Sequence, residues 1–127
     1  MQGKHLFEYA VIRIVPKVER EEFLNAGVIL YCKDLKFLQV KYIVNEHRIR
    51  AFCDKISIEE LHRHLQSFDD ICNARSKGGA IALLDMPSRF RWLTARRSTI
   101  VQCSQVHPGL SANAQATLEK LYEQLVV

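Results

Sequence analysis

Charged and amide side chains stand directly before an apolar, strand-forming run in the segment EREEFLNAGVIL, residues 19–30. In this segment Glu22 can hold Arg20, and side chains such as Asn25 can bond to free backbone groups. Gly27 is not followed by the glycine-rich helix start of a nucleotide-binding loop, which favours a bulge or a tight backbone approach there. The segment is therefore either a structural corner or part of a binding site.

Basic residues cluster later in the chain, between residues 75 and 97. Six arginine and lysine residues stand there against Asp85 alone, a local excess of five positive charges in a chain whose net charge is +4. With Phe90 and Trp92 beside them, these residues can bind phosphates by charge and bases by stacking. They can equally bind an acidic protein surface. The alternative is that the arginines lie on different faces and pair with acidic residues, while Trp92 fills the core.

A histidine, His107, follows a strand-forming run and precedes a proline, where an imidazole can cap the chain or act as an acid or base. No serine or cysteine stands in a nucleophile elbow, and nothing in the sequence requires Cys103 to contact His107. An enzyme hypothesis requires Arg20, Glu22 and His107 to converge in one pocket. The sequence identifies no catalytic residue.

The remaining metal-ligand residue types lack the spacing of a metal site. The two histidines His62 and His64 are two residues apart in a helical pattern and face different directions. The cysteines form neither a C-x-x-C pair nor a zinc cluster, and in a reducing compartment they are most simply small buried residues. They are Cys32, Cys53, Cys72 and Cys103. We expect no metal and no cofactor.

Length and composition favour a single soluble domain over residues 1–127. The chain is large enough to bury a continuous core, and 48% hydrophobic with 25% charged residues is typical of globular proteins. The amino terminus shows no secretion signal, and the longest apolar runs are far shorter than the roughly 20 residues that cross a bilayer. We expect a cytoplasmic protein with no membrane segment.

Strand patterns dominate the first part of the chain. High β-branched and aromatic content predicts strands over residues 7–15, 28–32 and 36–43, with a helical turn in the charged connector 17–22. Residues 45–53 can alternate as a strand or turn as a helix, and a strand is the preferred interpretation.

Helical patterns dominate the second part. Residues 57–74 carry an apolar stripe and an S-x-x-E capping box from Ser57 to Glu60, and residues 111–125 carry a second apolar stripe. A helical turn is expected over 88–94 and a strand over 98–103, while 80–84 fits either structure. The order predicts an α+β fold, with a mainly antiparallel sheet of about four to five strands packed against two main helices as a two-layer sandwich. The expected core residues are Tyr9, Val11, Val28, Leu30, Leu61, Leu65, Phe68, Trp92, Ile100, Leu118 and Leu121.

Three blocks of this sequence carry a resemblance to a known family: YAVIRIVP at 9–16, EREEFLNAGVIL at 19–30 and RFRWLTARRSTIVQCSQVHPGL at 89–110. Together with the carboxy-terminal leucine helix, they make the chain resemble the bacterial family called domain of unknown function 3037. The resemblance covers nearly the whole length and implies no established activity.

The family pattern singles out particular positions within those blocks. It favours Arg20, Glu22, Asn25, Gly27, Arg91, Trp92, Leu93, Ser98, Gln102, His107 and Gly109 of this chain. The chain departs from the pattern at Arg96 and Cys103. Members are often encoded beside HipA-like kinases, so the resemblance implies an accessory or regulatory partner rather than an independent enzyme.

These observations leave three functional hypotheses. The preferred one is a non-catalytic accessory subunit that binds a protein, such as a HipA-like kinase or a second copy of itself, through the basic segment 89–97. The others are a nucleic-acid-binding module and an enzyme. The candidate binding residues are Arg20, Glu22, Asn25, Arg89, Arg91, Trp92, Arg96, Arg97, Ser98, Gln102 and His107.

Overall fold

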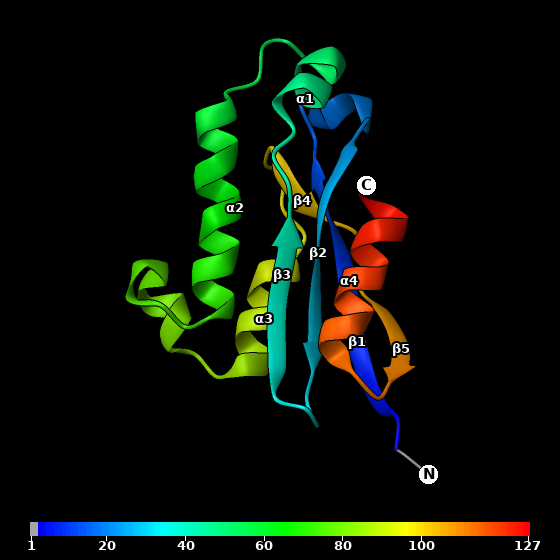
Figure 1. Ribbon diagram of the computed structural model, residues 1–127. Helices are drawn as coiled ribbons and strands as arrows, with labels where there is room; N and C mark the ends of the chain where they lie inside the picture. Colours follow the sequence, from blue (N-terminus) through cyan, green and yellow to red (C-terminus); the bar gives the residue numbers. More distant parts are fainter. Residues whose placement is uncertain (1–2) are drawn as a thin grey trace.

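A five-stranded antiparallel sheet forms the centre of the protein in the computed structural model, which describes residues 3–127 (Figure 1). Its order is β3-β2-β1-β4, and β5 also pairs with β1. The strands are β1 (His5–Ile14), β2 (Leu24–Cys32), β3 (Phe37–Tyr42), β4 (Val101–Cys103) and β5 (His107–Ser111). The predicted α+β fold with a mainly antiparallel sheet is confirmed.

Four α-helices and two 3-10 segments complete the described residues. The helices are α1 (Glu46–Phe52), α2 (Ile58–Cys72), α3 (Met86–Thr94) and α4 (Ala114–Leu125), and the 3-10 segments are η1 (Val18–Arg20) and η2 (Ser76–Leu83). The capping-box serine does start α2, because the Ser57 hydroxyl accepts a hydrogen bond from the backbone N–H of Glu60. No helix among residues 3–127 is both long and apolar enough to span a membrane.

The two main helices lie on opposite faces of the sheet (Figure 1). Because side chains alternate along a strand, Ile29 and Tyr31 of β2 join the core beneath α2 and α3, while Val28 and Leu30 join the core beneath α4. The sheet and the α2–α3 layer form the sandwich, and α4 packs on β2 and β3 from the other side. Phe7 of β1 also joins the core beneath α4, whereas β4 and β5 make few contacts with that helix.

A β-bulge in β2 sets the orientation of the residues near its start. The pairing with β1 shifts between Ile12 and Arg13, so that Asn25 lies opposite Arg13. Next to the bulge, a Cβ atom on Gly27 would lie 2.8 Å from the Lys41 carbonyl oxygen and the Tyr42 Cβ atom of β3. The predicted role of Gly27 in a tight backbone approach is confirmed.

Replacing Gly27 by alanine is expected to lower the free energy of unfolding by about 1–3 kcal/mol, because the added methyl group forces β2 and β3 apart. Urea denaturation of both proteins measures this change. Gly3→Ala is the matched control, since a Cβ atom there meets no atom within 4 Å. Equal stability of the Gly27→Ala variant and the parent would contradict the close approach.

The segment after β4 pairs with β1 a second time, as β5. Between the two pairings Ser104 is buried, its backbone N–H donates to the Val11 carbonyl at 2.8 Å, and its hydroxyl accepts from the Val11 N–H at 2.8 Å. The Ser104 hydroxyl therefore provides a hydrogen-bond partner for the Val11 N–H at the point where the pairing of β1 is interrupted. His107 therefore begins a strand that the sequence pattern did not predict.

Two expectations about local structure are wrong. Residues 45–53 form helix α1 rather than a strand, because the Asn45 side chain caps the helix by accepting from the Arg48 N–H. Trp92 is 41% exposed rather than buried, since α3 turns Arg89, Phe90 and Leu93 inward and Trp92 outward. Of the other expected core residues, three are only partly buried: Tyr9, Ile100 and Leu121. The rest are buried.

Candidate functional site

A polar cleft of about 710 Å³ lies over β1, β4 and the start of β5. Five of the predicted site residues line it: Arg96, Arg97, Ser98, Gln102 and His107. The cleft also contains Arg13 and Glu21, which the sequence analysis did not select. Strand pairing brings these distant segments together, because Arg13 lies opposite Gln102 and Tyr9 lies opposite His107.

Arg13 stands in the middle of a polar row across three strands, between Asn25 on β2 and Gln102 on β4. Its guanidinium carbon lies 3.9 Å from the centre of the Phe23 ring, and its Nε atom is buried without a hydrogen-bond partner. The amide nitrogen of Asn25 donates to the Leu125 carbonyl at 2.9 Å, whereas its Oδ1 atom is also unpartnered. Asn25 therefore anchors the end of α4.

A second arginine of the cleft also rests on an aromatic ring. The guanidinium carbon of Arg97 lies 4.1 Å from the centre of the Trp92 ring, and Arg97 donates a hydrogen bond to the Trp92 carbonyl. These contacts fix the guanidinium near the cleft and cover one face of the only tryptophan in the chain. The neighbouring Arg96 is exposed.

Positive charge exceeds negative charge in the cleft. Arg13, Arg96 and Arg97 face a single carboxylate, that of Glu21. The other lining groups are neutral hydrogen-bonding side chains, among them Gln102, whose amide donates to the Thr99 carbonyl at 2.8 Å. The His107 ring lies 5.3 Å from the Tyr9 ring, measured between centroids. The arrangement suits an anion better than a cation or an apolar ligand.

Cys103 also lines the cleft, but it is not an activated nucleophile. Burial raises the pKa of its thiol from 9.0 to about 12, and burial does the same for Cys72. At neutral pH both thiols are protonated and therefore weakly reactive. Among the described residues, no three acidic, histidine or cysteine side chains gather as a metal-binding group.

Iodoacetamide is expected to alkylate Cys72 and Cys103 slowly in the folded protein at pH 8 and rapidly in guanidinium, which peptide mass spectrometry measures. As the pH rises, these two thiols ionise in the unfolded chain before they ionise in the folded protein. The raised pKa values of Cys72 and Cys103 therefore contribute fully to the free energy of unfolding below the ordinary pKa of 9.0. This contribution is lost as the pH rises towards the folded pKa of about 12. Rapid alkylation of folded Cys103 would contradict this account.

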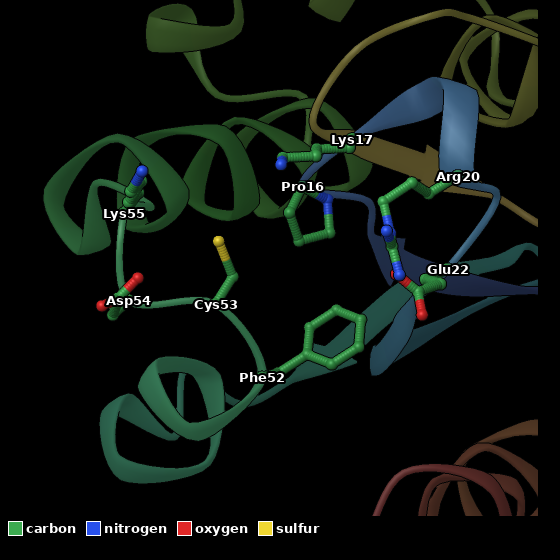
Figure 2. Close-up of a pocket in the computed structure, with 8 residues that line it drawn as sticks. All are labelled: Pro16, Lys17, Arg20, Glu22, Phe52, Cys53, Asp54 and Lys55. Carbon is green, nitrogen blue, oxygen red and sulfur yellow. The ribbon is translucent and has the colours of Figure 1, made fainter.

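Arg20 and Glu22 line a separate hollow of about 290 Å³, together with residues 52–55 at the end of α1 and just beyond it (Figure 2). Their side chains form an exposed ion pair with an Nε to Oε1 distance of 2.5 Å. Hydrogen bonding from Arg20, followed by its charge, lowers the pKa of Glu22. His107 lines the cleft and is not among the residues of this hollow, so the convergence of Arg20, Glu22 and His107 that the enzyme hypothesis requires is not found.

Arg89 is not available to a ligand. Its side chain is buried and donates to the carbonyls of Ile71 and Cys72 at the end of α2, and to that of Leu84. It therefore serves as an internal cap of α2, which corrects its place in the predicted binding segment.

The exposed Arg91 lies elsewhere again. It lines a third hollow with Leu6, Glu8, Tyr31, Lys33, Asp34 and Pro87. The basic segment is thus divided among the core, this hollow and the cleft. Only Arg96 and Arg97 of its four arginines line the cleft.

One sequence signal could have identified Arg13. It interrupts the apolar strand YAVIRIVP, and a charge within such a strand marks a position where the sheet face meets something other than a hydrophobic core. Glu21, the other charged residue of the cleft that was not selected, carries no comparable signal, because it is one of several acidic residues in the connector 17–22.

Comparison with known proteins gives a family and no named relative. No curated protein and no solved structure matches this chain. A family model described as "Protein of unknown function (DUF3037)" matches residues 9–126, nearly the whole chain, and confirms the resemblance carried by the three sequence blocks. The chain therefore belongs to the DUF3037 family of proteins of unknown function.

Proposed function

We propose that this protein is a non-catalytic binding domain that docks an acidic segment of a partner protein in the polar cleft. The observation that carries this proposal is the presence of Arg13, Arg96 and Arg97 in one cleft with Glu21 as its single carboxylate. Complementary charge favours the encounter with an acidic segment and fixes its register. The family resemblance suggests a HipA-like kinase as the partner, and a second copy of this chain is the simplest alternative.

A catalytic role has less support. Arg20 and Glu22 lie in a different hollow from His107, and the thiol of Cys103 is protonated at neutral pH. The cleft therefore has no activated thiol nucleophile, and the set of residues that the enzyme hypothesis requires is divided between two hollows.

Nucleic acid is the second candidate ligand, favoured by the exposed Trp92 beside Arg97. In that arrangement the guanidinium covers one face of the indole ring, so a base has only the other face on which to stack. A protein segment needs no free ring. We therefore place the protein partner first.

Affinity purification from the native host at low salt tests the proposal, with the tagged parent chain compared with an Arg96→Glu/Arg97→Glu variant. The parent is expected to retain a protein at equal stoichiometry, and the variant is expected to lose it because the charge of the cleft is reversed. Arg63→Glu on the exposed face of α2 is the control. Nuclease-sensitive material without a protein would instead support nucleic-acid binding, and no retained material would contradict both.

A further inference from the structure

The arginines of the cleft differ from most other arginines of the chain in lacking an acidic partner. Arg20, Arg50, Arg63 and Arg75 each form an ion pair with a nearby carboxylate. Among the described residues, no ion pair involves Arg13, Arg96 or Arg97. Three guanidinium groups therefore face one cleft with their charges uncompensated by direct contact.

The contacts of these arginines favour a fixed orientation. Arg13 lies against Phe23 and Arg97 lies against Trp92, so each flat guanidinium group is held by one face. A guanidinium group held in this way can donate from its edge N–H groups in its own plane, the geometry that binds a phosphate or carboxylate with two hydrogen bonds. One N–H group of Arg97 is already used by the Trp92 carbonyl. The Nε–H of Arg13 is buried and has no hydrogen-bond partner within the protein.

The balance of charge distinguishes between possible anions. With three guanidinium groups and the carboxylate of Glu21, the cleft carries a formal charge of about +2. A phosphate monoester carries about −1.5 to −2 at neutral pH and offers three strong acceptor oxygens. A single carboxylate or one phosphodiester carries only one negative charge. Ser98 and Gln102 line the same cleft and add neutral donors.

The size of the cleft indicates that the phosphoryl group belongs to a larger molecule. A volume of about 710 Å³ exceeds the space that one phosphoryl group needs. A smaller hollow of about 340 Å³ adjoins the cleft and is distinct from the two hollows described above. It shares Arg13, Val18, Glu21, Gln102 and Cys103 with the cleft and adds the apolar side chains of Val15 and Phe23. Apolar surface next to a cationic centre suits a peptide side chain that follows a phosphorylated residue.

We propose that the cleft is a binding site for a phosphate monoester carried on a protein segment, with Arg13, Arg96 and Arg97 as its ligands. This inference rests on the proposed function, because it specifies the chemistry of the segment that docks. The partner is recognised in its phosphorylated form and released when the phosphoryl group is removed.

Calorimetric titration of the full chain tests the inference, with N-acetyl-O-phosphoserine amide as the probe. The unphosphorylated serine amide, an aspartate amide and a single-stranded RNA hexamer are the comparison ligands. The phosphoserine compound is expected to bind at least about tenfold more tightly than the serine and aspartate compounds, because its additional charge-assisted hydrogen bonds contribute to the free energy of binding. Arginine side-chain NMR is expected to show a shifted Arg13 Nε–H signal on binding.

The variants separate the cleft from general surface charge. Arg96→Gln, at an exposed position, and Arg13→Gln are each expected to raise Kd about tenfold or more, while Arg63→Gln on α2 leaves Kd unchanged. If Arg13→Gln does not fold, Arg96→Gln alone decides the outcome. Equal binding of serine and phosphoserine compounds, stronger binding of RNA, or an equal effect of Arg63→Gln would overturn the inference.

The two proposals fail separately. If the phosphoserine compound binds but no protein is retained in the purification, the phosphate site is supported and the accessory-subunit function is contradicted. If a partner is retained equally well after phosphatase treatment and by the Arg96→Gln variant, the accessory function is supported and the phosphate site is contradicted.

Discussion

The Arg89→Met variant is expected to lose about 3–5 kcal/mol of unfolding free energy. Arg89 is only 7% exposed, and its guanidinium group donates to the Ile71 and Cys72 carbonyls at 2.8 Å. A third bond, from Nε to the Leu84 carbonyl, measures 3.0 Å. Methionine fills much of the volume but supplies none of these donors, and of the three carbonyls that of Ile71 keeps a backbone hydrogen bond, from the Ala74 N–H.

The position of these acceptors explains the size of the effect. Ile71 and Cys72 end α2, where the carbonyls of the last turn carry partial negative charge that favours a cation. Leu84 lies in the connection that leads into α3, so one side chain joins three segments. Loss of Arg89 therefore weakens the packing of α2 against α3, not only a single hydrogen bond.

Urea denaturation followed by circular dichroism measures the loss. Arg63→Met is the matched control, because Arg63 lies on the solvent face of α2, the helix that Arg89 caps, and its removal is expected to change stability little. Arg89→Lys is expected to recover only part of the stability, since an ammonium group cannot reach carbonyls in three directions as the guanidinium fork does. A loss below about 1 kcal/mol in Arg89→Met would contradict the capping role.

The Leu65→Ala variant is expected to lose about 2–5 kcal/mol. Leu65 lies in the middle of α2, is completely buried and belongs to the core that joins α2 to the sheet. Its truncation removes apolar contacts and leaves a cavity that the neighbouring strands cannot fill without moving. The width of the expected range reflects how far the surrounding side chains can relax into the cavity.

Thermal and urea unfolding of Leu65→Ala measure the cost. The matched control is Leu83→Ala, because Leu83 is 87% exposed and its truncation removes little buried surface. Similar losses in the two variants would contradict the placement of Leu65 at the centre of the core.

The sequence predicts the elements that carry a long or repeated pattern. The stripe and cap of α2, the strand runs of β1 to β3 and the final helix are found within a few residues of their expected bounds. Helix α1 was missed because it buries only Ile49, so its seven residues give little helical periodicity. Strand β5 was missed because Pro108 and Gly109 are residues typical of turns.

The candidate site was only partly predictable, for a physical reason. Arg96, Arg97 and His107 were selected from their residue types, and the structure brings them together in one cleft. Their neighbour Arg13 is more than 80 residues away in the sequence and joins them only through strand register, which local patterns do not specify. Burial of Arg89 depends on how the segment after α2 folds back so that α3 packs against the end of α2, and local sequence patterns do not predict this either.

Site-specific photo-crosslinking in the native host tests the central claim most directly. A photoreactive amino acid replaces the exposed Gln105 at the cleft, and in a second strain it replaces the exposed Gln66 on α2. The account predicts one protein crosslinked from Gln105 and not from Gln66, through a peptide that contains acidic or phosphorylated residues. Crosslinks of equal yield from both positions, or from Gln105 to RNA or to no partner, would contradict it.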